Sequence, residues 1–167
     1  MADWCIELFG KSHDRSAFTC GKPALDDFLR NRVTQYEKRR LGKTFVAVTE
    51  GENRVMGYYT LAAGAVPFKH LPIEVSPKLP KHPIPVILLT RLAVDQSAQG
   101  KGLGEKLLLD ALQRSLDISD KLGAHAVEVD ALDDSATAFY VKYGFAPLLD
   151  NPKHLYLPLA TIALALK

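Results

Sequence analysis

The first 64 residues combine short strand patterns with one amphipathic helix. Runs of β-branched and aromatic residues predict strands at 4–9, 44–49 and 55–64. The turn EGEN joins the last two runs, so they are expected to form a hairpin. Pro23 suits the first turn of a helix, and apolar residues at helical spacing run from Leu25 to Tyr36. That helix is expected to end at Leu41–Gly42.

The rest of the chain alternates strands and helices. The run 86–95 (VILLTRLAVD) is apolar and rich in Val, Ile and Leu, which predicts a central strand buried on both faces. Later strands are expected at 124–132, 145–149 and 154–159, with helices at 103–123, 134–144 and 161–167. Six prolines within 67–85 predict a long surface loop. The order predicts a single α/β domain over residues 1–167, a mixed sheet flanked by helices.

Composition limits the possible functions. With 167 residues and 47% hydrophobic content, the chain can bury a sizeable core. The net charge is only +2, so nucleic-acid binding would need local clusters of cations. Neither the two cysteines nor the five histidines show metal-ligand spacing, and no metal is expected. Without a signal-peptide pattern or a membrane-length apolar run, a cytoplasmic protein with no membrane contact is expected.

Three glycines, Gly100, Gly102 and Gly104, lie where the central strand leads into the next helix. The first amides of a helix lack intrahelical partners, and glycine lets a ligand approach them closely, so the pattern is typical of phosphate binding. Glu105 stands where a Walker loop or a dinucleotide fingerprint requires glycine, which excludes both. A connection that only tightens strand-to-helix packing remains an alternative.

Two motifs resemble those of the GNAT superfamily of N-acetyltransferases. Gln99-x-x-Gly-x-Gly after the strand LLTRLAVD is similar to the family's acyl-CoA pyrophosphate loop. The segment DDSATAFYVKYGF is similar to its C-terminal helix motif, with Ala136, Phe139, Tyr140, Gly144 and Phe145 at the matching positions. The sequence departs from the family at Asp133, where asparagine is usual, and this puts one hydrogen bond to the cofactor in doubt.

The resemblance implies a single-domain GNAT fold with a mostly antiparallel, twisted sheet, and acetyl-CoA as cosubstrate. It implies the following cofactor contacts: Leu92, Ala93, Val94, Gln99, Gly100, Lys101, Gly102, Leu103, Gly104, Asp133 and Ala136. Tyr140 would be the catalytic residue and give its phenolic proton to the departing thiolate. Alternatively, Tyr140 packs in the core beside Phe139, and Tyr143 is a competing donor.

More narrowly, FTCGKPALDDFLR, GYYTLAAGAV and LYLPL resemble the GNAT toxins of bacterial toxin–antitoxin modules. This implies aminoacyl-tRNA as substrate and a ribbon-helix-helix antitoxin as partner, and a homodimer is possible. The sequence offers no evident general base, which suits an α-amino group with a pKa of about 7.7–8 better than a lysine. Transfer to a small amine or a protein N-terminus remains open, as does a non-catalytic RNA- or protein-binding module.

Binding of tRNA would require cations. We expect RNA contacts from Arg30, Arg32, Lys38, Arg39, Arg40 and Arg91. The first five lie in or just after the first helix, where cations also stabilise the helix dipole without a ligand, or could bind an acidic antitoxin segment. Arg91 lies within the central strand, so it needs a partner such as a phosphate or a carboxylate.

Overall fold

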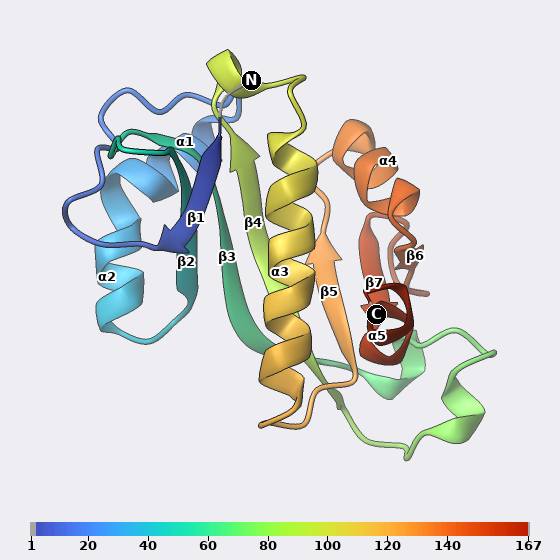
Figure 1. Cartoon of the computed structure of the whole chain (residues 1–167). Coiled ribbons are helices and arrows are strands. Elements are labelled where there is room, and N and C mark those ends of the chain that lie inside the picture. Colours follow the sequence, from blue (N-terminus) through green and yellow to red (C-terminus); the bar gives the residue numbers. More distant parts are fainter. Residues whose placement is uncertain (1–2, 167) are drawn as a thin grey trace. The chain divides into compact units, whose positions relative to one another are not determined.

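The computed structural model describes residues 3–166 and contains a seven-stranded sheet with the strand order β1-β2-β3-β4-β5-β7-β6 (Figure 1). The strands are β1 (Trp4–Leu8), β2 (Lys43–Thr49), β3 (Val55–Val66), β4 (Ile84–Val94), β5 (Ala126–Asp130), β6 (Ala146–Pro147) and β7 (His154–Pro158). Antiparallel pairs join β1, β2 and β3, and also β5, β7 and β6, whereas β4 and β5 run parallel. This confirms the predicted mixed, mostly antiparallel sheet.

The helices follow the predicted order. They are α1 (Pro23–Asp27), α2 (Val33–Lys38), α3 (Leu103–Ser119), α4 (Asp134–Lys142) and α5 (Leu159–Ala165). A π-helical turn, η1 (Phe28–Arg32), joins α1 to α2. Three short 3₁₀ turns are η2 (Phe68–His70), η3 (Ser76–Lys78) and η4 (Gln96–Ala98).

The chain forms two compact units. Unit 1 comprises the residues up to Ala62 together with Thr90–Ala111, and unit 2 comprises Ala63–Leu89 and the residues from Leu112 onward. By these bounds, β3, β4 and α3 each contribute residues to both units. The single domain over residues 1–167 stays a prediction.

The core of unit 1 forms where the helical segment α1–η1–α2 packs on β2 and β3 (Figure 1). Phe28, Leu29 and Val33 are almost fully buried, and the Phe28 ring stacks on Tyr58 with centroids 6.0 Å apart. This confirms the predicted apolar stripe after Pro23. The helix ends at Lys38 rather than at Leu41–Gly42, because Arg40 adopts a left-handed conformation with φ of 56°.

The core of unit 2 is built on the first part of β4 and on β5 and β7, which pair side by side. The surface loop predicted over residues 67–85 ends earlier, because β4 begins at Ile84, and its residues contribute to this core as well. Leu71 is buried, and Phe68 and Leu79 pack against the same cluster. The backbone N–H of Leu149 donates to the carbonyl of His70 at 2.8 Å, which attaches the segment to the residues after β6. The proline-rich segment therefore covers apolar residues of the sheet.

Two strand predictions need correction. The second half of β4 is not buried on both faces: Thr90 is exposed, and Leu92 and Val94 are half-buried. These three alternate residues share one face of the strand, and that face is partly open. The segment 145–149 forms a strand of only two residues, Ala146–Pro147, because just these two pair with β7.

Candidate functional site

The loop that enters α3 presents open backbone. Gly100 and Gly102 adopt φ values of 76° and 87°, which residues with a side chain rarely adopt, and a Cβ built on either would meet nothing within 4 Å. Leu103 begins α3, and the first amides of a helix have no intrahelical acceptor. Gly104 lies in that first turn. Open glycines beside unsatisfied amides fit a bound pyrophosphate.

The buried carboxylate of Asp95 holds the residues that lead into this loop. Asp95 is 1% exposed and accepts hydrogen bonds from the Thr19 amide at 2.9 Å and from the Ser97 amide and hydroxyl at 3.1 and 2.6 Å. Burial acts to raise the pKa of Asp95, but these hydrogen bonds and the Arg54 charge hold it below its usual range. We did not single out Asp95 from the sequence. The Asp-x-Ser pattern of a capping turn is the signal that could have identified it.

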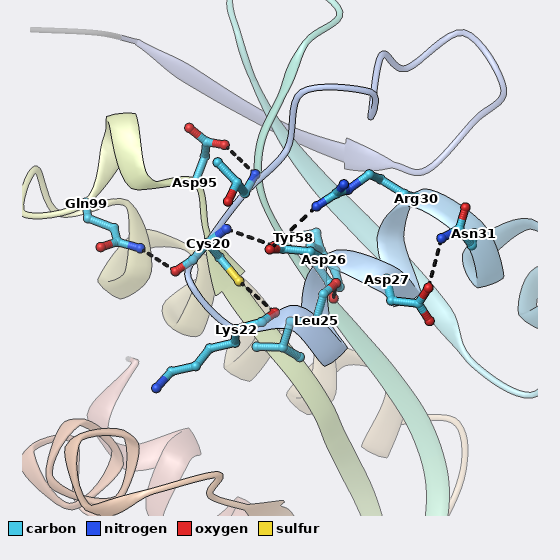
Figure 2. A network of polar contacts seen from close by, with 11 residues as sticks. Cys20, Lys22, Leu25, Asp26, Asp27, Arg30, Asn31, Tyr58, Asp95 and Gln99 are labelled. Atoms are coloured by element: carbon cyan, nitrogen blue, oxygen red, sulfur yellow. Dashed lines mark hydrogen bonds and ion pairs between the residues drawn. The ribbon is translucent and has the colours of Figure 1, made fainter.

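Gln99 ties the same loop to the segment before α1 (Figure 2). Its side-chain amide donates to the carbonyls of Cys20 and Val94 at 3.0 and 2.9 Å. The Cys20 amide in turn donates to the buried Asp26 carboxylate at 2.8 Å. Burial and, secondly, the Asp26 hydrogen bond raise the pKa of the Cys20 thiol to about 11, so it stays protonated at neutral pH. The Gln99 side chain thus positions the loop, while its predicted contact with the cofactor stays a prediction.

The other predicted cofactor contacts of unit 1 surround this loop. Lys101 is exposed, Leu103 and Ala93 are buried, and Leu92 and Val94 lie on the partly open face of β4. Close packing holds the end of β4 in place, since a Cβ on Gly57 would lie 3.1 Å from the Ala93 carbonyl oxygen. The end of β4 and the loop therefore form a fixed backbone surface within unit 1.

In unit 2, helix α4 begins with an aspartate cap. The Asp133 carboxylate accepts a hydrogen bond from the Ala136 amide at 2.8 Å, and the Asp133 carbonyl accepts one from the Thr137 hydroxyl at 2.9 Å. The residue that departs from the usual asparagine of the family thus has a structural role here. The predicted cofactor contacts of Asp133 and Ala136 stay predictions.

Tyr140 lies on the buried face of α4. It is 7% exposed and contacts Phe139 and Phe145 edge-on, with ring centroids 5.3 and 5.4 Å apart. Burial raises the pKa of the phenol well above its usual range, so the proton is held at neutral pH. Among the residues that the structure describes, none forms a hydrogen bond with the Tyr140 hydroxyl. Phe139 and Tyr143 are only half-buried.

The predicted RNA-binding cations differ in their surroundings. Those in or just after the helical segment, namely Arg30, Arg32, Lys38, Arg39 and Arg40, are all exposed. Arg30 pairs with Asp26 at 3.6 Å, and Arg32 pairs with Asp27 at 2.7 Å.

Arg91 is half-buried rather than enclosed. Its guanidinium carbon lies 3.7 Å from the centroid of the Phe28 ring and 5.1 Å from that of Tyr36, and one nitrogen donates to the Thr90 hydroxyl at 3.3 Å. An aromatic face thus supplies the partner that we expected from a phosphate or a carboxylate. The guanidinium therefore lies over the Phe28 ring rather than beside a carboxylate of any described residue.

Within residues 3–166, no group of three or more His, Cys, Asp or Glu side chains is arranged to hold a metal ion. Across the same residues, no helix has the length and apolar character needed to cross a membrane.

The chain is 43% identical over 144 residues to the "tRNA-acetylating toxin" of Mycobacterium tuberculosis, covering 86% of this chain and 85% of that one. It resembles the structure of AtaT complexed with acetyl-methionyl-tRNAfMet, with a TM-score of 0.92 and 31% identity over 99% of this chain and all of that one. A tyrosine-to-phenylalanine mutant of the AtaT toxin, bound to the C-terminus of the antitoxin AtaR and acetyl-CoA, gives a TM-score of 0.84 with 29% identity over 99% of both chains. The acetyltransferase (GNAT) domain matches residues 40–147, and the chain belongs to the GNAT acetyltransferase family.

Proposed function

We propose that this chain is a toxin that acetylates the α-amino group of aminoacyl-tRNA and thereby blocks translation. The observation that carries the proposal is the 43% identity, over 86% of the chain, to a toxin that acetylates tRNA. The likeness to AtaT in complex with acetyl-methionyl-tRNA, at a TM-score of 0.92, supports the same substrate. Acetylation of the α-amino group would remove the nucleophile that forms the next peptide bond.

Acetyl-CoA, when bound, supplies an acetyl thioester. In our proposal, the open amides at Gly100, Gly102 and the start of α3 bind its pyrophosphate, with Gln99 and Asp95 holding that loop in shape. The backbone of β4 from Leu92 to Val94 binds the pantetheine, and an amide of this stretch donates to the thioester oxygen. This assignment is supported by the positive φ values of two glycines and by the open face of β4.

Tyr140 is the proposed general acid. Its raised pKa keeps the phenol protonated at neutral pH, and a hydroxyl engaged by no other described residue is free to donate to the departing thiolate. The acceptor needs less help, because an α-amino group has a pKa of only about 7.7–8 and is partly neutral at cellular pH. A site with an acid and no dedicated base suits that acceptor.

We also infer the setting in which this activity operates. The AtaT structure with the C-terminus of its antitoxin supports an antitoxin partner here. From the resemblance of the sequence, we propose that this partner is a ribbon-helix-helix protein, that the chain acts in the cytoplasm as one acetyltransferase domain, and that it can form a homodimer. Each of these stays a proposal.

The deciding experiment uses purified protein, acetyl-CoA and a mixture of charged tRNAs. Mass analysis of the aminoacyl ends of the tRNA should show a gain of one acetyl group after incubation with the wild-type enzyme. The Tyr140→Phe variant is the matched control and should not produce this gain. The mixture also identifies the preferred amino acid. Acetylation of polyamines or peptide N-termini, with charged tRNA left unmodified, would refute the proposal that aminoacyl-tRNA is the substrate. Binding of acetyl-CoA without acetylation of any amine would refute the proposed enzymatic activity.

A further inference from the structure

A pocket outside the cofactor loop lies in unit 1. It has a volume of about 340 Å³ and is lined by His13, Asp14, Arg15, Ser16 and Arg30. These residues come from two places: the loop after β1, and the π-helical turn η1. The volume is near the lower end of ligand pockets, which hold roughly 300–1,000 Å³. All five lining residues carry a polar or charged group, and two of them are arginines, which favours an anionic ligand.

Arg15 is built into this pocket by the π-helical turn. One guanidinium nitrogen donates to the Leu29 carbonyl within η1 at 3.1 Å, and the guanidinium carbon lies 5.1 Å from the centroid of the Phe9 ring. A π-helical turn interrupts the regular ladder of helix hydrogen bonds, and such turns are frequent at functional sites. One arginine thus caps the irregular turn that also presents Arg30. Its half-buried, fixed guanidinium is organised before any ligand arrives.

Arg30 is the second arginine that lines the pocket. Its guanidinium pairs with the Asp26 carboxylate at 3.6 Å (Figure 2), a distance that leaves hydrogen-bonding capacity for another group. The two imidazole nitrogens of His13 are engaged with Gly10 and with the Glu7 carboxylate. The free donors of the pocket are therefore those of the two arginines.

Asp14 gives the pocket one negative group. Its Oδ1 accepts hydrogen bonds from the amide and the hydroxyl of Ser16 at 3.0 and 2.7 Å, and these hydrogen bonds lower its pKa. A carboxylate beside two arginines suits a ligand that carries an anion and a hydroxyl donor together. The RNA backbone repeats that combination at every phosphate and ribose 2′-hydroxyl, whereas an acidic peptide does not.

We propose that this pocket binds a phosphodiester of the tRNA substrate, with Arg15 and Arg30 holding the phosphate oxygens and Asp14 accepting from a neighbouring ribose hydroxyl. This inference rests on the proposed function, because it takes the RNA to be the acceptor. It adds Arg15 to the expected RNA contacts, which the sequence placed in the helical segment and at Arg91. The exposed cations from Arg32 to Arg40 continue along the same chain segment and suit a polyanion of regular spacing.

The test is direct binding of uncharged tRNA, measured by fluorescence anisotropy at several salt concentrations. Arg15→Gln should weaken binding about tenfold, because a charge-assisted hydrogen bond is lost. The slope of log K against log salt should fall by about 0.7–0.9 for one lost phosphate contact. Lys11→Gln is the matched control, since it removes the same charge from the same exposed loop without lining the pocket, and it should leave both quantities as in the wild type.

A second variant separates binding from folding. If Arg15→Gln melts at a lower temperature because it loses the hydrogen bond to the Leu29 carbonyl, Ser16→Asp is the deciding variant. Ser16 is exposed and lines the pocket without contacting η1, so aspartate at this position adds a second carboxylate that should weaken tRNA binding. Wild-type affinity and salt slope in folded Arg15→Gln, or in folded Ser16→Asp, overturn the inference. Normal tRNA binding with lost binding of an antitoxin peptide also overturns it and assigns the pocket to a protein partner. Failure of the wild type to acetylate charged tRNA refutes the proposed function instead, since binding of uncharged tRNA requires no turnover.

Discussion

The loop of unit 1 and helix α4 of unit 2 supply the two halves of the proposed chemistry in different ways. At the loop, the groups proposed to bind acetyl-CoA are backbone amides. The side chains of Asp95 and Gln99 hold the loop in place through five hydrogen bonds. At α4, the working group is a single phenol, and the rings of Phe139 and Phe145 hold it by packing.

The difference determines how each region can fail. A binding site made of backbone amides has no side chain to delete. Such a site loses its ligand only when an added group occupies the ligand's space or when the hydrogen bonds that hold the loop are removed. A side-chain site can lose one oxygen and keep its shape. Mutations at the loop should therefore change binding of acetyl-CoA, and mutations at Tyr140 should change turnover.

The largest effect is expected for Gly102→Asp. Gly102 has a φ of 87° and open space where a Cβ would be, so aspartate would add both a side chain and a negative charge where the pyrophosphate is proposed to bind. Calorimetry should detect no acetyl-CoA binding. Gly51→Asp is the matched control, because Gly51 has a φ of 82° and equally open space but lies in the β2–β3 turn. Unchanged affinity in folded Gly102→Asp would remove the cofactor assignment from this loop.

The next effect is that of Tyr140→Phe. Loss of a general acid lowers kcat by about 10²–10⁴-fold, with little change in acetyl-CoA affinity. The melting temperature should hardly change, because the hydroxyl has no hydrogen-bond partner among the described residues and the ring remains packed. Tyr143→Phe, in the half-buried competitor, is the control and should keep near-normal turnover. Full activity of a stable Tyr140→Phe enzyme would transfer the role to Tyr143 or to water.

The sequence predicts the elements of this fold well because its local signals agree with its tertiary contacts. The apolar stripe after Pro23 is the buried stripe, and Gly100 and Gly102 take conformations that only glycine adopts readily. The proline-rich segment was predicted less well. Its prolines correctly exclude long helices and strands, but nothing in the local pattern shows that Leu71 is buried in a core formed by distant residues.

The candidate site was predictable where it follows a contiguous motif and not where it depends on distant partners. The pattern around Gln99 identifies the loop, but its bond to Cys20 spans 79 positions and has no sequence signal. Arg91 was expected to meet an anion, yet Phe28, far away in sequence, supplies its partner. Arg15 was overlooked because its hydrogen bond to the Leu29 carbonyl depends on the π-helical turn, and that irregularity has no signal in an otherwise regular helical pattern.

A smaller effect is expected from the exposed cations. Charge reversal of both Arg30 and Lys38 to glutamate should raise the KM for charged tRNA about tenfold and flatten its dependence on salt, because phosphate contacts are lost. Acetyl-CoA affinity should remain as in the wild type, which separates this surface from the loop. Lys121→Glu, an exposed lysine of unit 2, serves as the control for an unspecific change of charge. An unchanged salt dependence in the double variant would show that the phosphate contacts lie elsewhere.

The smallest effect concerns pH and again separates the two units. In unit 2, burial acts to lower the pKa of His154, but hydrogen bonds to Glu128 at 2.7 Å and to Asp150 at 3.0 Å outweigh it and raise the pKa above the usual value. A raised pKa in the folded state stabilises the protein below the unfolded pKa of about 6.5, and that contribution is lost as the pH rises through the folded value.

The free energy of unfolding of the wild type should therefore exceed that of His154→Gln by a larger margin at pH 6.0 than at pH 8.5, as measured by urea denaturation. In unit 1, the pKa of Asp95 is lowered, so its contribution is present above the unfolded value of about 3.9 and constant between these two pH values. Asp95→Asn should thus lower the free energy of unfolding by the same amount at pH 6.0 and at pH 8.5. A difference for His154→Gln that grows with pH would contradict the ion pairs around this histidine.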